Sequence, residues 1–433
     1  MQAFYIMITL VTGGTGLIGK AVEFCIEQAP SSDEHWIFLG SKDLNLLDED
    51  SVDAAFKKYN PTHVLHLAAL VGGLFRNIGN NLNMFMLNMR MNETLLKYCH
   101  KYNVKKCVSC LSTCIFPDKV TYPINETMVH NGPPHNSNYG YSYAKRMLDV
   151  LNRGYNEQYG CMFTSVVPTN VFGPHDNFNL QDCHVIPGLI HKVYKAKHDG
   201  GDFVVWGTGK PLRQYIYSRD LAKLMIWCVR NYDSIEPLIL SVDESEEISI
   251  KDTALKIAKA FDYDADKIKF DTTKSDGQFK KTVSNQKLKS LIPDLKFTPI
   301  DEAIQVTCDW FQENYLIART RRSTLRLWKT EIKVQEELNR MLSDRHTLKR
   351  SLNPPNDRPF SEWQIIEEAA ALLQPLEEAT EVLCLDIYVT ISLVFPILKE
   401  AKSALESVPT ESLQFFKDTF LNTMNDRFGD LDQ

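Results

Sequence analysis

Two side chains with complementary acid–base chemistry, Tyr141 and Lys145, stand four positions apart in the segment Tyr-Ser-Tyr-Ala-Lys. On a helix this spacing places both side chains on one face. An ammonium beside a phenol favours the phenolate, so we expect Lys145 to lower the pKa of Tyr141 from its usual value of about 10. Tyr141 would then donate or accept a proton near neutral pH. Because this spacing also arises by chance, the pair needs support from elsewhere in the chain.

Ser112 and Cys114 follow a predicted strand, residues 106–111, and add further chemistry. Ser112 can donate a hydrogen bond to a carbonyl oxygen held beside the Tyr141 hydroxyl. Two roles stay open for Cys114, since a buried cysteine usually acts as a small hydrophobe but can also be an acid–base group. His184 is a further titratable candidate downstream, although a lone histidine is usually structural.

A glycine-rich turn near the N-terminus predicts a dinucleotide site. Residues 4–11 are apolar and rich in β-forming residues, so we expect a buried strand, and residues 20–28 have a helical pattern. Gly13, Gly16 and Gly19 lie between them and allow a tight turn, close approach of the backbone to a pyrophosphate, and close helix–strand packing. An ordinary glycine-rich turn is the alternative, but the place between a first strand and a helix favours the dinucleotide.

The end of the second predicted strand, residues 36–39, indicates which dinucleotide is bound. Enzymes that use NAD usually carry an acid there, which holds the ribose 2′-hydroxyl. Ser41 and Lys42 follow Gly40 instead, and a hydroxyl beside an ammonium suits the 2′-phosphate of NADP(H). Asp43 weighs against this preference, and a solvated Lys42 is the alternative interpretation. We expect NADP(H).

Three further segments are expected to contribute to the site. Residues 64–69 predict a buried strand whose small residues let a cofactor approach, and His66 on it fits a hydrogen-bonded core histidine better than a catalyst. A turn-rich segment follows a strand over residues 164–167 and leaves the nucleotide fold. Beyond it, Trp206 can pack on a base or sugar and Arg213 can pair with phosphate, with a surface hairpin as the alternative.

The composition argues against several classes of protein. The chain has 433 residues, 44% of them hydrophobic, which suffices for a sizeable core in two or three domains. A net charge of -7 gives no support for binding to nucleic acid or to an anionic membrane. The ten cysteines show no paired CxxC motifs, so neither a metal site nor a disulfide framework is predicted. No apolar segment approaches about 18 residues and no signal peptide is evident, so we expect a cytoplasmic protein without a membrane span.

The composition changes after Tyr315. Nineteen of the twenty glycines precede it, and only Gly429 follows it. Helical patterns run over residues 319–350, 363–376 and 385–405. We therefore expect a C-terminal helical extension that carries no cofactor motif.

Taken together, the motifs resemble the extended short-chain dehydrogenase/reductases and, more closely, the GDP-L-fucose synthase family. The resemblance covers residues 5–316. It rests on the glycine-rich turn, the Tyr141–Lys145 pair and three longer motifs: Val71-Gly72-Gly73-Leu74, Ser112-Thr113-Cys114-Ile115-Phe116-Pro117, and the Asn170–Asp176 turn with His184. It implies that the substrate is GDP-4-keto-6-deoxy-D-mannose, that C3 and C5 are epimerised, and that NADPH then reduces the C4 ketone to give GDP-L-fucose.

The same resemblance implies roles for individual residues. Removal of a proton α to the C4 ketone gives an enolate, whose oxygen Ser112 and Tyr141 can stabilise. Inversion needs a group on each face of the ring, and these would be Cys114 as base and His184 as acid. Tyr141 would protonate O4, while Lys145 would lower its pKa and hold the nicotinamide ribose. The implied cofactor contacts are Gly13, Gly14, Gly16, Leu17, Ile18, Gly19, Ser41, Lys42, Ala68, Lys145, Pro168, Asn170, Val171 and His184. The implied substrate contacts are Lys192, Trp206, Arg213 and Asp276, with Lys192 standing where the family often has arginine.

The C-terminal segment resembles something else, an internal segment of hAT-family transposases. The matching residues are Trp363, Pro375-Leu376-Glu377-Glu378-Ala379-Thr380 and Tyr388-Val389-Thr390-Ile391-Ser392-Leu393. The segment is too short for the metal-dependent catalytic fold of those enzymes, and we can assign no carboxylate triad in it. We therefore expect a captured fragment or a gene fusion, with a DNA-binding tail as the minority alternative.

These interpretations predict an α/β fold with a Rossmann-type, doubly wound parallel sheet, a smaller mixed substrate-binding lobe and the helical extension. The expected domains are an NADP-binding domain (1–167, with the return of about 214–240), a substrate-binding lobe (168–213 and 241–316) and the tail (317–433).

A long helix over residues 80–100 carries an apolar stripe that indicates core packing and could also form a dimer seam, so we expect a homodimer. Two rival functions stay open. One is another sugar-nucleotide epimerase or dehydratase, which does not require Cys114 with His184. The other is a non-catalytic NADPH-binding scaffold.

Overall fold

The computed structural model describes residues 6–72, 79–181 and 183–319, all of which lie in one compact unit. The helices expected after residue 319 lie outside the described residues. No helix within the described ranges is long and apolar enough to cross a membrane.

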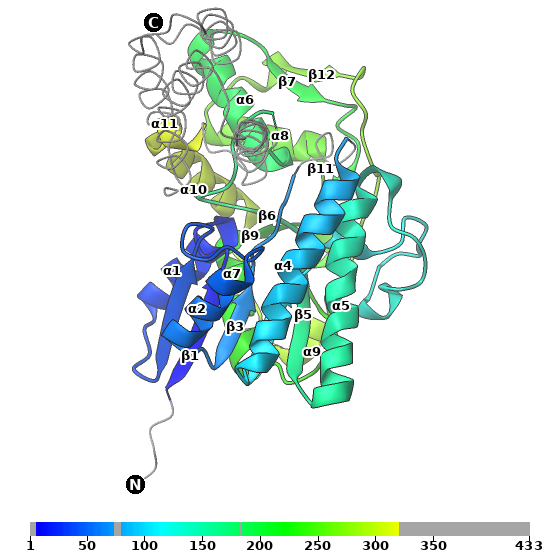
Figure 1. Cartoon of the computed structure of the whole chain (residues 1–433). Coiled ribbons are helices and arrows are strands. Elements are labelled where there is room, and N and C mark those ends of the chain that lie inside the picture. Colours follow the sequence, from blue (N-terminus) through cyan, green and yellow to red (C-terminus); the bar gives the residue numbers. More distant parts are fainter. Residues whose placement is uncertain (1–5, 73–78, 182, 320–433) are drawn as a thin grey trace, which may run out of the picture. The chain divides into compact units, whose positions relative to one another are not determined.

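Six parallel strands, of which Figure 1 labels β1, β3 and β5, form the central sheet in the order β10-β5-β4-β3-β1-β2. Their bounds are β1 (Met7–Thr12), β2 (Glu34–Leu39), β3 (His63–His66), β4 (Lys106–Cys110), β5 (Met162–Pro168) and β10 (Leu238–Leu240). The strand order reverses between β1 and β3, which both pair in parallel with their neighbours. In open parallel sheets, ligands bind beyond the carboxyl ends of the strands at such a reversal.

Both faces of the sheet are apolar, because successive side chains of a strand point to opposite faces. Leu10 and Val64 pack into one buried cluster, whereas their neighbours Val11 and Leu65 pack into another. The continuous apolar segments of the sequence therefore correspond to strands that are covered on both sides.

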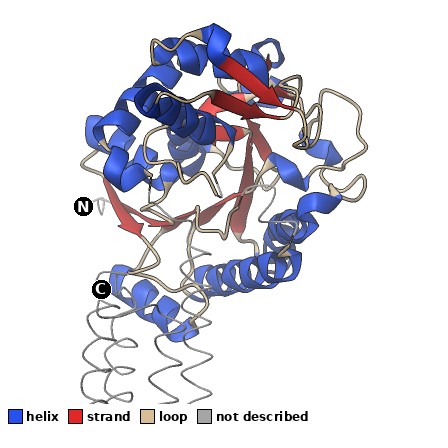
Figure 2. Ribbon diagram, turned by 90° about the horizontal axis from the view of Figure 1, so that it is seen from above, coloured by secondary structure: helices blue, strands red, loops and turns tan. Residues whose placement is uncertain are grey.

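Helices cover both faces, as Figure 2 shows. Their bounds are α1 (Leu17–Gln28) and α7 (Ser218–Asn231) on one face, and α2 (Glu49–Tyr59), α4 (Asn81–Lys101) and α5 (Tyr139–Tyr159) on the other. The predicted Rossmann-type, doubly wound parallel sheet is therefore confirmed. One strand is shorter than predicted, since β3 ends at His66 and the backbone of Leu67 and Ala68 turns toward Thr12.

The remaining elements form a smaller mixed α/β part around a third apolar cluster, which includes Phe178, Leu189, Phe203 and Phe311. Its helices are α6 (Val185–Asp199), α8 (Ile250–Ala260), α10 (Ile300–Glu313) and α11 (Tyr315–Ala318). Its short strands are β6 (Asn170–Phe172), β7 (Phe203–Trp206), β8 (Leu212–Arg213), β9 (Tyr215–Tyr217), β11 (Ile248–Ser249) and β12 (Ile268–Asp271). Helix α9 (Gln286–Leu291) packs near β10. The division of the chain into domains at the stated residues stays a prediction.

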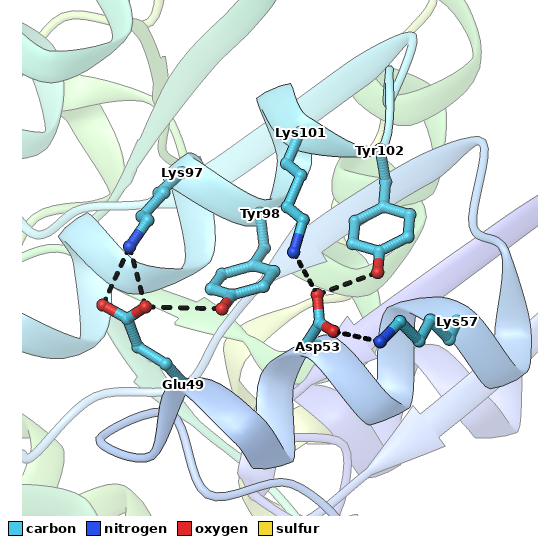
Figure 3. A network of polar contacts seen from close by, with 7 residues as sticks. All are labelled: Glu49, Asp53, Lys57, Lys97, Tyr98, Lys101 and Tyr102. Atoms are coloured by element: carbon cyan, nitrogen blue, oxygen red, sulfur yellow. Dashed lines mark hydrogen bonds and ion pairs between the residues drawn. The ribbon is translucent and has the colours of Figure 1, made fainter.

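Polar contacts join the outer surfaces of α2 and α4 (Figure 3). Lys97 pairs with Glu49 at 2.7 Å, and Lys101 pairs with Asp53 at 2.5 Å. The Tyr102 hydroxyl donates to Asp53 at 2.8 Å. Because these ion pairs are largely exposed, they contribute little to stability, and the apolar contacts beneath them provide the packing.

Candidate active site

Helix α5 positions the first candidate pair, Tyr141 and Lys145. Both side chains are buried, with exposed fractions of 9% and 1%. The Lys145 amine donates a hydrogen bond to the Cys110 carbonyl at 2.7 Å and lies 6.0 Å from the centroid of the Tyr141 ring. The four-residue spacing therefore places both groups on one helical face, as predicted, beside the end of β4.

The pKa of Tyr141 departs from the prediction. Burial raises the pKa of Tyr141 well above its ordinary value, and the nearby thiols of Cys114 and Cys110 add to the rise. Burial also lowers the pKa of Lys145. The expectation that Lys145 lowers the pKa of Tyr141 is therefore wrong in this structure, because desolvation of the phenolate dominates and the amine is directed to a carbonyl. The phenol is protonated at neutral pH, which is the form that a proton donor needs.

Ser112 and Cys114 lie directly after β4, in a short 3-10 helix that spans Thr113–Ile115. The Ser112 hydroxyl caps this helix by accepting from the Cys114 N–H at 3.4 Å. Cys114 is 7% exposed and close enough to Tyr141 to affect its pKa. Burial alone suits both of the roles left open for Cys114, so its acid–base role stays a prediction.

Arg146 is a residue that the sequence analysis missed. Its guanidinium donates to the Ile115 carbonyl from Nε at 2.9 Å and to the Gly132 carbonyl from Nη1 at 2.8 Å. Arg146 therefore ties the segment that carries Cys114 to the helix that carries Lys145. The only sequence signal for this role is its position next to Lys145.

Lys281 is a second missed residue. Burial lowers the pKa of Lys281, and its charge interacts with Cys114, Arg213 and Asp118. The Lys281 ammonium is therefore close enough to a candidate catalytic thiol and to a candidate phosphate-binding guanidinium to interact with both charges. The signal in the sequence is a lysine pair, Lys280 and Lys281, that follows the loop with the candidate Asp276.

His184 is an exposed residue that immediately precedes α6. The Gly188 N–H donates to its carbonyl at 3.0 Å, so the backbone of His184 begins this helix. The contacts described above place Ser112, Cys114, Tyr141 and Lys145 around the carboxyl end of β4. The role of His184 opposite Cys114 stays a prediction.

The glycine-rich turn joins the carboxyl end of β1 to the start of α1. A Cβ atom on Gly13 would lie 2.8 Å from the Ala68 N, and Gly13 has a φ of +71°, which favours glycine. A Cβ on Gly19 would lie 2.4 Å from the Gly14 carbonyl oxygen. Leu17 and Ile18 then form the first turn of α1 and direct its free N–H groups toward this turn. The turn fits a pyrophosphate because only glycine leaves the backbone this close and this open.

Ser41 and Lys42 are exposed residues just beyond the carboxyl end of β2. The Asp43 carboxylate accepts a hydrogen bond from the Gly40 N–H at 2.9 Å. One oxygen of the acid that weighed against NADP(H) is therefore held by the local backbone. The Ser41 hydroxyl and the Lys42 ammonium are groups suited to a 2′-phosphate.

The other candidate cofactor residues lie at neighbouring strand ends. Ala68 follows β3, Pro168 ends β5, and Asn170 and Val171 belong to β6. The Asn170 amide donates to the Gln214 carbonyl at 3.0 Å and so fixes β6 against β9. These positions surround the end of the sheet at which parallel strands place their ligands.

Lys192 and Trp206 form one side of a separate cavity. The Lys192 ammonium lies 3.9 Å from the centroid of the Trp206 ring and donates to the Val204 carbonyl at 3.1 Å. Trp206 is 45% exposed. The cavity measures about 240 Å³, and its lining also includes Lys195, Asp199 and Asp202. An exposed indole face beside a cavity of this size suits a planar base or a sugar.

Arg213 and Asp276 differ in what they present. Burial lowers the pKa of Arg213, whose Nη1 donates to the Leu212 carbonyl at 2.7 Å. Both carboxylate oxygens of Asp276 are already used, since they accept from the Thr208 N–H and hydroxyl at 2.7 Å each. Asp276 therefore holds the turn that follows Trp206, and its direct contact with a substrate stays a prediction.

No group of three or more histidine, cysteine or acidic side chains that could hold a metal ion is found in the part of the chain that the structure describes. The buried groups Cys114, Tyr141 and Lys145 lie by the carboxyl end of β4, and the glycine-rich turn lies at the carboxyl end of β1.

Comparison with known proteins identifies the family. The NAD dependent epimerase/dehydratase family matches residues 9–242, and the chain belongs to it. A GDP-L-fucose synthase of Dictyostelium discoideum is 58% identical over 310 residues, which cover 72% of this chain and 97% of that protein. A probable GDP-L-fucose synthase of Drosophila melanogaster is 53% identical over 317 residues, covering 72% and 98%. Within the wider family, the chain belongs to the GDP-L-fucose synthases.

Solved structures agree with this assignment. A GDP-L-fucose synthetase of Naegleria fowleri bound to NADP is 50% identical, with a TM-score of 0.69. The match covers 72% of this chain and 96% of that one.

Proposed function

We propose that this protein converts GDP-4-keto-6-deoxy-D-mannose to GDP-L-fucose by epimerisation at C3 and C5 and reduction at C4. The observation that carries the proposal is the 58% identity to a GDP-L-fucose synthase, 97% of which is covered. The buried Tyr141–Lys145 pair beside Ser112 and Cys114 supports it, because these groups suit the proton transfers of both steps.

The cofactor is NADPH, which supplies the hydride for C4. The glycine turn at Gly13–Gly19 receives the pyrophosphate, and Ser41 and Lys42 receive the 2′-phosphate. Lys145 holds the nicotinamide ribose from the base of the site. The NADP-bound structure of the Naegleria fowleri relative supports this choice of cofactor.

Tyr141 acts in the reduction as the proton donor to O4. Its raised pKa keeps the hydroxyl protonated at neutral pH, so a proton is present when negative charge develops on O4. Ser112 donates a second hydrogen bond to the same oxygen. The two donors also stabilise the enolate that forms when a proton leaves C3 or C5.

Cys114 and His184 act in the epimerisation. Inversion requires that one group remove a proton and that another deliver one from the opposite face of the sugar ring. Cys114 approaches from the end of β4 as the base, and His184 approaches from the start of α6 as the acid.

The nucleotide part of the substrate extends along the smaller α/β part. Trp206 and Lys192 contact the nucleoside beside the 240 Å³ cavity. Arg213 and Lys281 face the diphosphate, where two cations offset its charge. Asp276 holds the Thr208 turn in place, and the substrate contact of Asp276 is proposed at this turn.

The enzyme acts as a cytoplasmic homodimer in this proposal. Exposed apolar residues on the adjacent helices α4 and α5 support the dimer, among them Leu82, Met86 and Val150 with exposed fractions of 71%, 41% and 47%. A second copy that packs α4 and α5 against the same helices would cover them. Light scattering would test the mass, and a monomer at micromolar concentration would refute this part.

The NADP-binding domain and the substrate-binding lobe are proposed to have the bounds that the sequence predicts, so the enzyme ends at residue 316. Residues 317–433 are proposed to be a fused unit that resembles an internal fragment of a hAT-family transposase. This unit takes no part in the reaction, and no nucleic-acid partner is proposed.

The test of the function is NADPH oxidation by the purified protein, followed at 340 nm with GDP-4-keto-6-deoxy-D-mannose. Oxidation that depends on this substrate separates the proposal from a non-catalytic scaffold. Product identification separates it from other sugar-nucleotide epimerases or dehydratases.

A further inference from the structure

A buried chain of hydrogen bonds runs across the point where the strand order of the sheet reverses. Thr12 ends β1, His66 ends β3, and the two residues are directly paired in the sheet. Asn92 comes from α4 and Ala144 from α5, the helix that carries the catalytic pair (Figure 1). Thr12, His66 and Asn92 have exposed fractions of 1%, 0% and 1%, so water does not compete for their polar atoms.

The contacts define one direction for every hydrogen bond. The Asn92 amide Nδ2 donates to the Ala144 carbonyl at 3.3 Å, so its Oδ1 faces the His66 Nε2 at 3.1 Å and accepts from it. The His66 Nδ1 is then an acceptor, and the Thr12 hydroxyl donates a hydrogen bond to it at 2.8 Å. The Thr12 oxygen in turn accepts from the Ala68 N–H at 3.3 Å. Burial and the charge of Lys145 lower the pKa of His66 to about 3, which keeps the imidazole neutral as this pattern requires.

The two ends of the chain lie at the two halves of the site. At one end, the Ala68 backbone is the surface against which Gly13 packs with no room for a Cβ. At the other end, the Ala144 carbonyl belongs to the residue before Lys145. A buried, fully satisfied network has one favourable arrangement, since each unpaired member would be costly.

We propose that Thr12, His66 and Asn92 are positioning residues that hold the dinucleotide turn in register with the catalytic face of α5. None of them contacts the reacting atoms. Each acts through its neighbour, by fixing the Ala68 backbone at one end and the Ala144–Lys145 backbone at the other. The effect on kcat rests on the proposed NADPH-dependent function. The effect on the dissociation constant of NADPH requires only that the protein bind NADPH.

The experiment compares variants of the hydrogen-bond network with matched controls. Thr12→Val removes the hydroxyl at nearly constant shape, whereas Thr12→Ser keeps the hydroxyl. Thr9→Val is its control, because Thr9 lies on the same strand, is 0% exposed and has no hydrogen-bond partner for its hydroxyl among the described residues. Asn92→Leu removes the hydrogen bonds at the α5 end of the network. Its control is Asn152→Leu on α5, because Asn152 is also 1% exposed but bonds the Ser165 hydroxyl instead.

We expect Thr12→Val to raise the dissociation constant of NADPH, measured by calorimetry without substrate, about five- to tenfold. Thr12→Ser should restore it and Thr9→Val should leave it unchanged. Asn92→Leu should raise the dissociation constant of NADPH and should also lower kcat at saturating NADPH by a similar factor. Asn152→Leu should lower the melting temperature without changing either quantity. The Thr12→Val/Asn92→Leu double variant should weaken NADPH binding by less than the sum of the two single effects. The reason is that either substitution alone already interrupts the hydrogen-bond network.

Equal NADPH affinities for Thr12→Val and Thr9→Val would overturn the inference, as would strict additivity in the double variant. Loss of substrate-dependent turnover in the wild-type protein would instead refute the proposed function, and the binding comparison would still decide the role of the chain.

Discussion

Replacement of Tyr141 by phenylalanine removes one oxygen atom and leaves the ring in its buried position on α5. The proton donor to O4 is then lost, while the Lys145 bond to the Cys110 carbonyl is untouched. We expect kcat to fall roughly 100- to 10,000-fold, the scale of general acid catalysis. This fall corresponds to about 3–5 kcal/mol of transition-state stabilisation. NADPH binding should be unchanged, and the free energy of unfolding should change by less than about 1.5 kcal/mol, since only one hydroxyl is removed.

The matched control is Tyr143→Phe, on the same helix but outside the catalytic pair, where the ring lies 5.3 Å from the Arg146 guanidinium. It should keep near-normal kcat. The assays are steady-state NADPH oxidation, calorimetric NADPH binding and thermal unfolding of both variants. Near-normal turnover of Tyr141→Phe would remove Tyr141 from the mechanism, and a fall of equal size in both variants would indicate a structural effect.

The raised pKa of Tyr141 adds a pH dependence. The folded protein keeps this phenol protonated at pH values where the unfolded chain, with a pKa of about 10, loses the proton. The contribution of Tyr141 to stability is thus fully present below about pH 10 and is lost as pH rises through the higher folded pKa. Tyr141 should therefore cause no alkaline loss of kcat below about pH 10.

Three further predictions concern epimerisation, cofactor choice and the tail. Two substitutions, Cys114→Ser and His184→Gln, should each slow solvent deuterium uptake at C3 and C5 more than they slow reduction of an already epimerised substrate. Uptake at the wild-type rate in both variants would mean that these residues have only a structural role. Ser41→Ala with Lys42→Ala should remove the preference for NADPH over NADH in kcat/KM, and a wild-type protein without that preference would contradict the 2′-phosphate site. A chain that ends within Tyr315–Ala318 should keep full specific activity and be more soluble than the whole chain, with less self-association in light scattering. A folded but inactive truncated protein would place the tail in the enzyme.

Features that depend on neighbouring residues in the sequence were predictable. The parallel sheet follows from short apolar segments that alternate with helical patterns, and β1, the glycine turn and α1 follow each other directly. Tyr141 and Lys145 share a face because they belong to one helix. The position of Ser112 and Cys114 after β4 likewise needed only the strand to be recognised.

Features that depend on tertiary burial were not predictable. The prediction that the pKa of Tyr141 is lowered was wrong, because burial outweighs the effect of the Lys145 amine. That amine bonds the Cys110 carbonyl, which lies 35 residues away in the sequence. Asp276 is used by Thr208, which is 68 residues away in the sequence, so its availability could not be inferred from its type. Lys281 gains its importance only where the fold brings it near Cys114, and nothing local distinguishes it from other lysines.

His66 shows the limit of single-residue arguments. The sequence favoured a hydrogen-bonded core histidine over a catalyst, and the structure confirms that both ring nitrogens are paired. What the sequence did not show is that its partners, Thr12 and Asn92, connect the two halves of the site. That connection depends on strand order, which places β1 beside β3.

The most direct test of the central claim is the identity of the product formed from GDP-4-keto-6-deoxy-D-mannose. The purified full-length protein would be incubated with this substrate and NADPH in deuterated water, and the product would be examined by NMR. We expect GDP-L-fucose, with deuterium at C3 and C5 and one NADPH oxidised per molecule formed. A product reduced at C4 without inversion at C3 and C5, or unchanged substrate, would contradict it.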